Sequence, residues 1–298
     1  MIKAKVIADS VSTAGIRITT MQLTYPRYVH AEFMTHRVFS RNSASSRAIP
    51  IKKNLGDVWR QPAIPPHWGR NQKGMQAHEE LKGWRLVAAK SIWTFHRWLS
   101  LGAAWGLAAL GTHKQLGNRL VEVHNHITVL VTSTKWANFL ALRDHPDAEP
   151  SMQELARAIM FARSNSIPTK LLEGEWHLPY ISAHERSTAV HIQDLLDVSI
   201  ARCARLSYFT LDTNQATTLA QDRDLAARLL KQVPLHASPG EHQATPDPAE
   251  RREHQWGNFH GWVQYRKTLP NESQHDQQYK GNTTDGHQRG KDTTGAGV

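Results

Sequence analysis

The sequence predicts a protein that mixes long helices with a few strands, of the α+β or α/β class. Residues 2–9 and 17–25 alternate apolar and polar side chains enough to suggest two strands. Residues 126–132, HITVLVT, form a short β-branched run typical of a buried strand. Several longer segments repeat apolar residues at steps of three and four, as amphipathic helices do.

Between the first predicted strands and the long helices lie three segments of different composition. Pro26 closes the second strand, and residues 28–37 predict a helix with Val29, Phe33 and Met34 on one side. Residues 40–47 are small and polar, so we expect a loop. Residues 61–75 hold three prolines and two glycines, which predict a long irregular connection.

The strongest helical pattern covers residues 76–101, and a second, interrupted by three glycines, covers 103–123. Further helices are predicted at 151–163, 191–206 and 217–232. No linker precedes residue 271, so we expect one domain over 1–270. From 271 to 298 the chain is polar and almost without apolar residues, which predicts a disordered tail.

Composition excludes several classes of protein. The 298 residues give ample chain for a core, and the lone Cys203 excludes an intrachain disulfide framework or a Cys-rich zinc site. No apolar run reaches the roughly 18–20 residues of a membrane span. The N-terminus lacks the apolar region of a secretory signal. We therefore expect a soluble, cytoplasmic protein without a membrane partner.

The net charge of +10 indicates an anionic partner, such as nucleic acid, a nucleotide, a phosphorylated cofactor or an acidic protein. Residues 1–60 hold ten lysines and arginines against three acidic residues, whereas residues 272–298 hold three against four. The positive charge is therefore concentrated near the N-terminus, and the chain has no basic tail of the kind that coats nucleic acid.

Residues 35–47 combine histidine, arginines, hydroxyl groups and an amide in thirteen positions. Arginine offers a planar fork for phosphate or a pyrimidine edge, and small hydroxyl residues let backbone N–H groups approach an anion. The segment suits a nucleotide-binding loop. No standard P-loop or dinucleotide fingerprint is present, and a solvated Ser/Arg loop is the alternative reading.

The stretch HRVFSRNSASSR, residues 36–47, resembles the signature of flavin-dependent thymidylate synthases, R-H-R-x-x-S-x-N-E-x-S-x-R-Y. The matching positions are His36, Arg37, Ser40, Asn42, Ser45 and Arg47. Four positions depart from the pattern: Thr35 replaces the first Arg, Ser43 the Glu, Ala48 the Tyr, and Glu32 an upstream Gln.

Four other stretches are similar to segments of the same family. Residues 138–143 look like its N-F-L-x-L-R helix, and 146–149 are similar to the region that follows. Residues 202–208 resemble R-A-A-R-V-S-F, and 236–242 resemble H-E-T-P-F-E-H, although in the family both precede the signature. This order implies a circular permutation, which is tolerated where termini lie close together. Residues 165–190 are an insert without a counterpart.

The resemblance implies an α+β fold of the flavin-dependent thymidylate synthase type, with helices packed on a small mixed or antiparallel sheet and one catalytic domain over 1–270. It implies C5 methylation of dUMP to dTMP, with FAD, NADPH as reductant and methylenetetrahydrofolate as one-carbon donor. It also implies a homotetramer with sites between subunits. The compact, permuted form suggests a phage-encoded protein, which would act in the host cytoplasm.

The resemblance also assigns roles to residues. Ser45 and Arg47 would be catalytic, and substrate would be bound by Glu32, Ser45, Ser46, Arg47, His126 and Gln153. Cofactor would be bound by His36, Arg37, Asn42, Arg143, Ser207 and His236. His126, or alternatively His124, and Gln153 fall where the family carries arginines that bind the nucleotide.

Each of these residues has a structural alternative. Arg143 could end a helix, His236 could be a loop residue and Ser207 a helix-end hydroxyl. Cys203, between apolar neighbours, and Trp84, Trp93 and Trp98 are expected in the core. His124 and His126 could share one side of a strand, but no third metal ligand is evident, so we expect no metal.

The departures leave other functions open. Glu32 can accept from a cytosine amino group, so dCMP could be the substrate, or the product could be hydroxymethylated. A non-catalytic nucleotide-binding or nucleic-acid-binding protein is the second alternative, although no RRM, KH or helix-turn-helix signature is present. Methylation through a cysteine nucleophile needs a thiolate in an electropositive pocket, which the surroundings of Cys203 do not offer.

Overall fold

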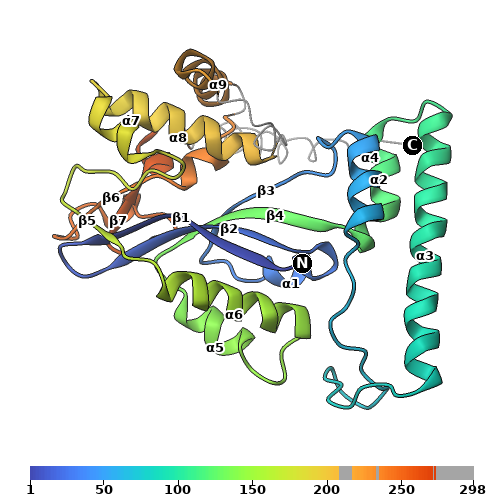
Figure 1. The fold of residues 1–298 in the computed structure, drawn as a ribbon. Helices are drawn as coiled ribbons and strands as arrows, with labels where there is room; N and C mark the ends of the chain where they lie inside the picture. Colours follow the sequence, from blue (N-terminus) through green and yellow to red (C-terminus); the bar gives the residue numbers. More distant parts are fainter. Residues whose placement is uncertain (208–216, 233–234, 271, 273–298) are drawn as a thin grey trace, which may run out of the picture.

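The protein is built on a five-stranded sheet that helices cover on both faces (Figure 1). The computed structural model describes residues 1–207, 217–232, 235–270 and 272. The strand order is β3-β4-β2-β1-β5, and only the pairing of β5 with β1 is parallel. The strands are β1 (Lys3–Ser12), β2 (Arg17–Pro26), β3 (Ser40–Ser43), β4 (His126–Ser133) and β5 (Thr169–Leu171). The predicted α+β class with a small mixed sheet is confirmed at this level.

The helices form three groups around the sheet (Figure 1). One face carries α5 (Ala137–Arg143) and α6 (Pro150–Ser164), with the short α1 (His30–Phe33) beside them. The other face carries α7 (Ala183–Thr188), α8 (Ile192–Ser207) and α9 (Leu219–Lys231), together with the hairpin of β6 (Ala244–Pro246) and β7 (Trp262–Gln264). At one end of the sheet stand α2 (Ile51–Arg60), α3 (Trp84–Ala109) and α4 (Lys114–Gly117).

The alternation along β2 decides which side chains each face buries. Met21, Leu23 and Tyr25 point toward α6 and join the main core cluster, which also holds Phe139 and Leu155. Successive side chains of a strand point to opposite faces, so the intervening residues of β2 face α8. The predicted strands at 2–9, 17–25 and 126–132 are therefore confirmed, each with bounds shifted by a few residues.

Two predictions near the signature segment are wrong. The helix expected over 28–37 is only a 3₁₀ turn, Arg27–Val29, followed by the single turn of α1. The loop expected over 40–47 begins instead as β3, which pairs with the edge of β4. Serine and asparagine have little strand propensity, but the unpaired edge of β4 offers backbone hydrogen bonds that override this preference.

The helices predicted over 76–101 and 103–123 are also corrected. One continuous helix, α3, begins at Trp84 and passes through Gly102 and Gly106 before it ends at Ala109. Gly111, with a φ of +79°, completes the turn after it. The rest of the second prediction is the short α4 and a 3₁₀ helix, Asn118–His124.

The tryptophans of α3 are not core residues, contrary to expectation. The exposed fraction is 76% for Trp84 and 40% for Trp98, while Trp93 is half-buried and donates its indole N–H to the carbonyl of Ala63. α3 has more apolar side chains than positions in contact with α2 and α4. The three- and four-residue spacing of its apolar residues therefore does not identify a buried face.

The remaining helix predictions, at 151–163, 191–206 and 217–232, correspond to α6, α8 and α9. Within the predicted insert 165–190, β5 pairs with β1 and α7 packs near α8. The predicted tail 271–298 lies outside the described residues except for Glu272. Within the described ranges, no helix combines the length and apolar character of a membrane span.

A buried chain of hydroxyl and imidazole groups lies between the sheet and the α8 side. His177 is hydrogen-bonded to Ser10 (2.9 Å) and Thr20 (2.8 Å), Thr20 to Thr132 (2.6 Å), and Thr132 to His242 (2.8 Å). Burial lowers the pKa of both His177 and His242 to about 3. Both imidazoles are therefore neutral in the folded protein at ordinary pH.

These two histidines make the stability of the fold depend on pH. Between about pH 6.5 and 3 the unfolded chain binds protons that the folded chain excludes, so the free energy of unfolding falls as pH falls. Replacing His242→Gln removes one such group. Between pH 7 and 5 the variant should lose about 2 kcal/mol less than the wild type, measured by urea denaturation. His254→Gln, at an exposed site, should follow the wild type; equal pH dependence of all three proteins contradicts this prediction.

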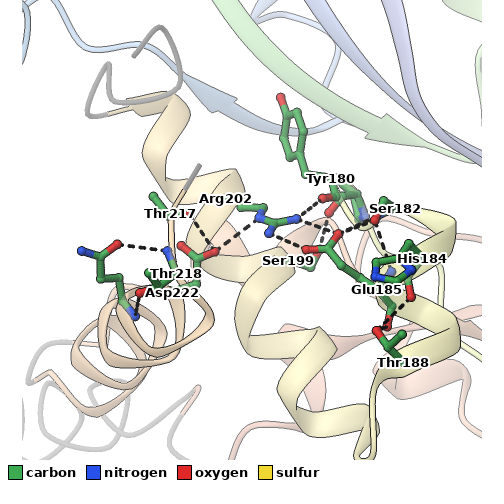
Figure 2. A network of polar contacts seen from close by, with 12 residues as sticks. Tyr180, Ser182, His184, Glu185, Thr188, Ser199, Arg202, Thr217, Thr218 and Asp222 are labelled. Carbon is green, nitrogen blue, oxygen red and sulfur yellow. Dashed lines mark hydrogen bonds and ion pairs between the residues drawn. The ribbon is translucent and has the colours of Figure 1, made fainter. Parts of the chain in front are cut away.

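A network of ion pairs joins α7, α8 and α9 (Figure 2). Asp222 on α9 is fully buried and accepts from Arg202 (3.3 Å), Arg205 (2.8 Å) and Thr217 (2.9 Å). Arg202 also donates to Glu185 on α7 (2.6 Å) and to the carbonyl of Tyr180 (2.6 Å). The arginines of the 202–208 motif therefore hold helices together in this fold.

Replacing Asp222→Ala leaves two guanidinium groups without their buried counter-charge. We expect the free energy of unfolding to fall by about 3 kcal/mol, because removing one partner of a buried ion pair costs far more than the pair contributes. Asp224→Ala, two residues away on the same helix, removes only an exposed pair with Arg228. It should cost about 0.5 kcal/mol or less. Equal losses in urea denaturation would show that the network is not structural.

Candidate functional site

A cavity of about 670 Å³ opens between α1, α5, the start of α6 and the irregular segment before α3. Three predicted site residues from separate segments line it: Glu32, Arg143 and Gln153. The other lining residues are His67, Gly69, Met75, Gln76, Ala77, His78, Pro146, Asp147, Ala148, Glu149 and Pro150. We call this cavity the Glu32–Arg143 pocket.

Arg143 is the centre of the polar contacts in this pocket. Its Nε donates to Nε2 of His36 at 3.0 Å, and its Nη1 lies 3.8 Å from the carboxylate of Glu32. The guanidinium therefore joins two other predicted site residues, both from the segment 28–37. Its ionic contact with Glu32 is partly exposed, so the fork stays within reach of a ligand in the pocket.

Packed aromatic rings hold Arg143 and His36 in register. Phe139, one helical turn before Arg143 on α5, lies 4.9 Å from the ring of His36 and 5.7 Å from that of Phe33. Phe139 and Phe33 are fully buried. Residues four apart on a helix share one face, so packing Phe139 against His36 also brings Arg143 to it.

The environment of His36 favours its neutral form. Burial, then the positive charges of Arg143 and Arg41, lowers the pKa of His36 below its ordinary value. Because Nε of Arg143 can only donate, Nε2 of His36 accepts and the ring proton is on Nδ1. The pocket is therefore lined by a permanent cation, Arg143, whose neighbour is a neutral imidazole.

The start of α6 supplies the opposite wall. Glu149 precedes the helix and accepts from the backbone N–H of Met152 (2.8 Å) and the hydroxyl of Ser151 (3.1 Å). Burial raises the pKa of Glu149. Gln153 donates its amide to the carbonyl of His145 at 2.9 Å. Carboxylate, amide and guanidinium groups together can recognise the polar edge of a heterocyclic base.

The predicted phosphate-binding residues lie elsewhere. Ser46 is buried and donates to the carboxylate of Glu122 at 2.7 Å, and Glu122 also lies near Arg27 and Arg119. The groups that could bind phosphate there face an acidic side chain of the same chain. Ser45 is half-buried and Arg47 is exposed beside it.

His126 lies in another, smaller cavity of about 260 Å³, together with Lys3, Lys53 and Arg60. Its Nε2 is 2.7 Å from the amino group of Met1. The sequence suggested that His124 and His126 share a strand, but they do not. His124 ends a 3₁₀ helix and is hydrogen-bonded to His96 at 2.8 Å. The two histidines therefore serve different surroundings, and the described residues contain no group of three side chains suited to a metal ion.

The predicted cofactor residues divide between the two faces of the sheet. His36 and Arg143 meet on the α5 side, and Arg37 is exposed next to His36. Asn42 donates to the carbonyl of Cys203 on α8, and exposed His236 follows α9. Ser207 ends α8, and its side chain lies outside the described residues.

This division bears on the fit of FAD. Neither the Glu32–Arg143 pocket nor the cavity around His126 is lined by Arg37, Asn42 or His236. The groups present in the Glu32–Arg143 pocket suit one polar heterocycle, and Asn42 donates to the backbone of Cys203 instead. The residues of this pocket therefore do not by themselves fit a whole flavin dinucleotide.

Sequence reasoning missed the segment 67–78 as part of a site. Residues up to 75 were expected as an irregular connection and 76–78 as the start of a helix, but the whole segment is irregular, folds back through a bridge between Gly69 and Glu80, and forms a wall of the pocket. His67 and His78 enter the site in this way. The prolines just before this segment and its two glycines were the available signal, since long structured loops without secondary structure are often functional.

Cys203 is a buried core residue, as predicted. It packs with Leu130 and Leu206, accepts from the amide of Gln243 (3.6 Å), and burial raises the pKa of its thiol. A neutral thiol in the interior is not a nucleophile.

No family model matches the sequence, and no curated protein matches it. Similar solved structures include two of a UMP/dUMP methylase PolB from Streptomyces cacaoi, one bound with 5-Br UMP and one with 5-Br dUMP. The first has 15% identity and a TM-score of 0.41, over 55% of this chain and 89% of that chain. The second has 11% identity and a TM-score of 0.42, over 55% and 90%. At such values the site has to be argued from this chain's own residues.

The contact between Arg143 and His36 can be tested by titration. Replacing Arg143→Gln removes the nearby positive charge, so the pKa of His36 should rise toward the ordinary value of about 6.5. Histidine signals followed by NMR against pH, with His36→Gln to assign the signal, measure the change. Arg228→Gln, at an exposed position on α9, is the control. An unchanged His36 titration in Arg143→Gln would contradict the contact.

Proposed function

We propose that this protein is an enzyme that modifies C5 of a pyrimidine nucleotide of the deoxyuridine monophosphate type, by one-carbon transfer and reduction. FAD, NADPH and methylenetetrahydrofolate are the cofactor and co-substrates in this proposal. The observation that carries it is that Glu32, Arg143 and Gln153 line one pocket and that Arg143 also contacts His36. Glu32 and His36 lie at the signature segment, whereas Arg143 and Gln153 come from stretches much later in the chain, and nothing in that spacing requires them to meet.

The pocket provides the groups that a pyrimidine edge requires. A uracil ring has carbonyl acceptors and an N–H donor, which match a guanidinium or amide donor and a carboxylate acceptor. Arg143 and Gln153 supply the first kind, and Glu32 supplies the second. The buried aromatic cluster of Phe33 and Phe139 keeps Arg143 preorganised, so less entropy is lost on binding.

The flavin would supply the hydride for the one-carbon unit when bound. Since one chain brings only His36 and Arg143 together, we propose that a homo-oligomer completes the flavin site, with a second copy contributing residues from the α8 side. The tetramer implied by the resemblance is one such assembly. What this chain itself contributes is the orientation of the base by Arg143 and a neutral His36 beside it.

A different substrate is favoured by one observation. Glu32 stands at the pocket with its carboxylate partly exposed, and a carboxylate accepts from the amino group of cytosine. The alternative substrate is therefore dCMP, with methyl or hydroxymethyl as the C5 substituent. Under this alternative, Glu32→Gln lowers turnover of dCMP and spares that of dUMP. A nucleotide-binding protein without catalysis is the remaining alternative.

The test begins with the colour of the full chain. Purified protein should bind FAD with the absorption bands of a flavin, and NADPH should bleach them. With methylenetetrahydrofolate and NADPH, dUMP or dCMP should then be converted to a C5-modified product detected by mass spectrometry. Failure to bind FAD, or to convert either nucleotide, would overturn the proposed enzyme.

Arg143→Ala should lower kcat/KM about 10- to 100-fold, since it removes a charge-assisted hydrogen bond to the ligand and the partner of His36. Arg228→Ala, at an exposed position on α9, is the matched control. Cys203→Ala should retain activity, because the buried thiol takes no part in this chemistry. Loss of activity in a folded Cys203→Ala protein would instead indicate covalent catalysis.

A further inference from the structure

The outer face of α3 carries a continuous apolar seam. The helix stands at one side of the molecule and contacts the rest through α2, α4 and the 3₁₀ helix Asn118–His124 (Figure 1). Its inner face buries Ser100, Leu101 and Ala104. Its outer face leaves large apolar side chains exposed, among them Ile92 (69%) and Phe95 (63%).

The outer residues repeat with the spacing of a coiled coil. Steps of four and three residues connect positions 88, 92, 95, 99, 102, 106 and 109, which are Ala88, Ile92, Phe95, Leu99, Gly102, Gly106 and Ala109. An alternation of this kind keeps one seam facing a partner helix over the whole length. Lys90 and Arg97 fall on the side opposite this seam, and exposed Arg85 continues the seam spacing beyond its N-terminal end, so pairing over residues 92–109 would bury none of the three.

We propose that this seam docks against the same seam of a second copy of the chain, with the two α3 helices antiparallel. The seam has a bulky half, Ile92, Phe95 and Leu99, followed by a small half, Gly102, Gly106 and Ala109. In an antiparallel pair with its two-fold axis between Leu99 and Gly102, each bulky residue lies opposite a small one. Leu99 then faces Gly102, Phe95 faces Gly106, and Ile92 faces Ala109.

This match of large and small side chains indicates that the partner of the seam is a second copy of the chain. A parallel pair would place Phe95 against Phe95 and glycine against glycine, which leaves crowding at one end and a gap at the other. Only the antiparallel arrangement fills both halves, and it does so symmetrically, as an isologous two-fold interface requires. The seam is therefore complementary to itself.

The exposed area is in the range of a small specific interface. A fully exposed aromatic side chain offers about 200 Å². At that value, the exposed fractions of Phe95, Trp98 and Trp105 correspond to about 340 Å² per copy. Ile92 and Leu99 add to this area, so two copies together approach the roughly 1,000 Å² that a specific interface buries. Trp98 and Trp105 flank the seam on one side and would close its rim.

The first test is the mass of the full chain in solution, without nucleotide or cofactor. Light scattering coupled to size exclusion should give twice the chain mass of 33.7 kDa, or a larger assembly built from such pairs. Leu99→Glu should halve that mass, whereas Thr94→Glu, exposed on the same helix but off the seam, should not. A monomeric wild type, or an unchanged mass of Leu99→Glu, would overturn the pairing.

A second variant separates specific packing from general stickiness. A Cβ added at Gly102 or Gly106 meets no atom within 4 Å in the single chain, so the first atom of each leucine in Gly102→Leu/Gly106→Leu fits the fold, and leucine favours the helix. It also adds apolar surface. Non-specific association would therefore increase, but the proposed pair loses the space for Leu99 and Phe95 and should dissociate. An unweakened pair in this variant contradicts the proposal.

Crosslinking tests the direction of the helices. In the antiparallel pair, Phe95 is about 17 Å along the axis from its copy and opposite Gly106. Phe95→Cys/Gly106→Cys should form a disulfide-linked dimer under mild oxidation, and Phe95→Cys alone should not, because a disulfide spans at most about 7 Å between Cα atoms. The native Cys203 is buried and leaves the readout clean. Efficient crosslinking of Phe95→Cys alone would indicate a parallel pair and overturn the proposal. These masses and crosslinks do not depend on the proposed activity.

Discussion

The register of β4 against β2 is the constraint on which the rest of the molecule depends. Residues of the two strands pair from Thr19 with Ser133 to Pro26 with His126, without a bulge. A strand shifted by one residue presents all its side chains to the opposite face. Here such a shift would move Met21 and Val131 out of the α6 core and bring Thr20 and Thr132 into it. The hydrophobic core on one face and the buried histidine chain on the other therefore specify the same register.

The pairing of β4 with β2 also determines the geometry of the Glu32–Arg143 pocket. From the end of β2 the chain turns at Pro26 into α1, which carries Glu32, and from the end of β4 it turns at Trp136 into α5. Because α5 runs back beneath the sheet, Phe139 reaches the rings of Phe33 and His36, and Arg143 meets His36 one turn later. Two neighbouring antiparallel strands that finish at opposite ends of the sheet thus bring their following helices together at one place. Through these aromatic contacts, the register of the strands determines where the guanidinium group of Arg143 lies.

The sequence predicted the parts of this structure that depend on local periodicity. The alternation in β2 and the three- and four-residue steps of α6, α8 and α9 each reflect a single buried face, so element type could be predicted and bounds came within a few residues. Prediction failed where a contact with a segment distant in the sequence determines the structure or the exposure of a residue. Ser40–Ser43 becomes a strand only because β4 offers it an edge, and Trp84 and Trp98 have helical spacing yet stay exposed because that spacing faces away from the chain.

The site was predictable in the same partial way. Residue chemistry and resemblance selected Glu32, His36, Arg143 and Gln153, which meet, but also Ser46 and Asn42, which contact Glu122 and the backbone of Cys203 instead. Side-chain chemistry says what a residue can bind, whereas its position on one or the other face of the sheet decides whether it shares a cavity with its neighbours in the motif. Asn42 and Arg41, adjacent on β3, show this directly: Asn42 reaches α8, while Arg41 donates to the carbonyl of Met34 on the α1 side.

The exposed seam of α3 and the divided cofactor residues lead to one conclusion about assembly. The segment 67–78 forms a wall of the Glu32–Arg143 pocket and leads directly into α3, so whatever fixes α3 also fixes that wall. In a single chain α3 is buried at Ser100, Leu101 and Ala104 in its C-terminal half, and its N-terminal half is held by Trp93 and His96, which contact Ala63 and His124. Pairing along the seam places the C-terminal half of one α3 against the N-terminal half of the other. Each copy then covers apolar residues that its partner leaves exposed, and the pair restrains α3 and, with it, the pocket wall that leads into the helix.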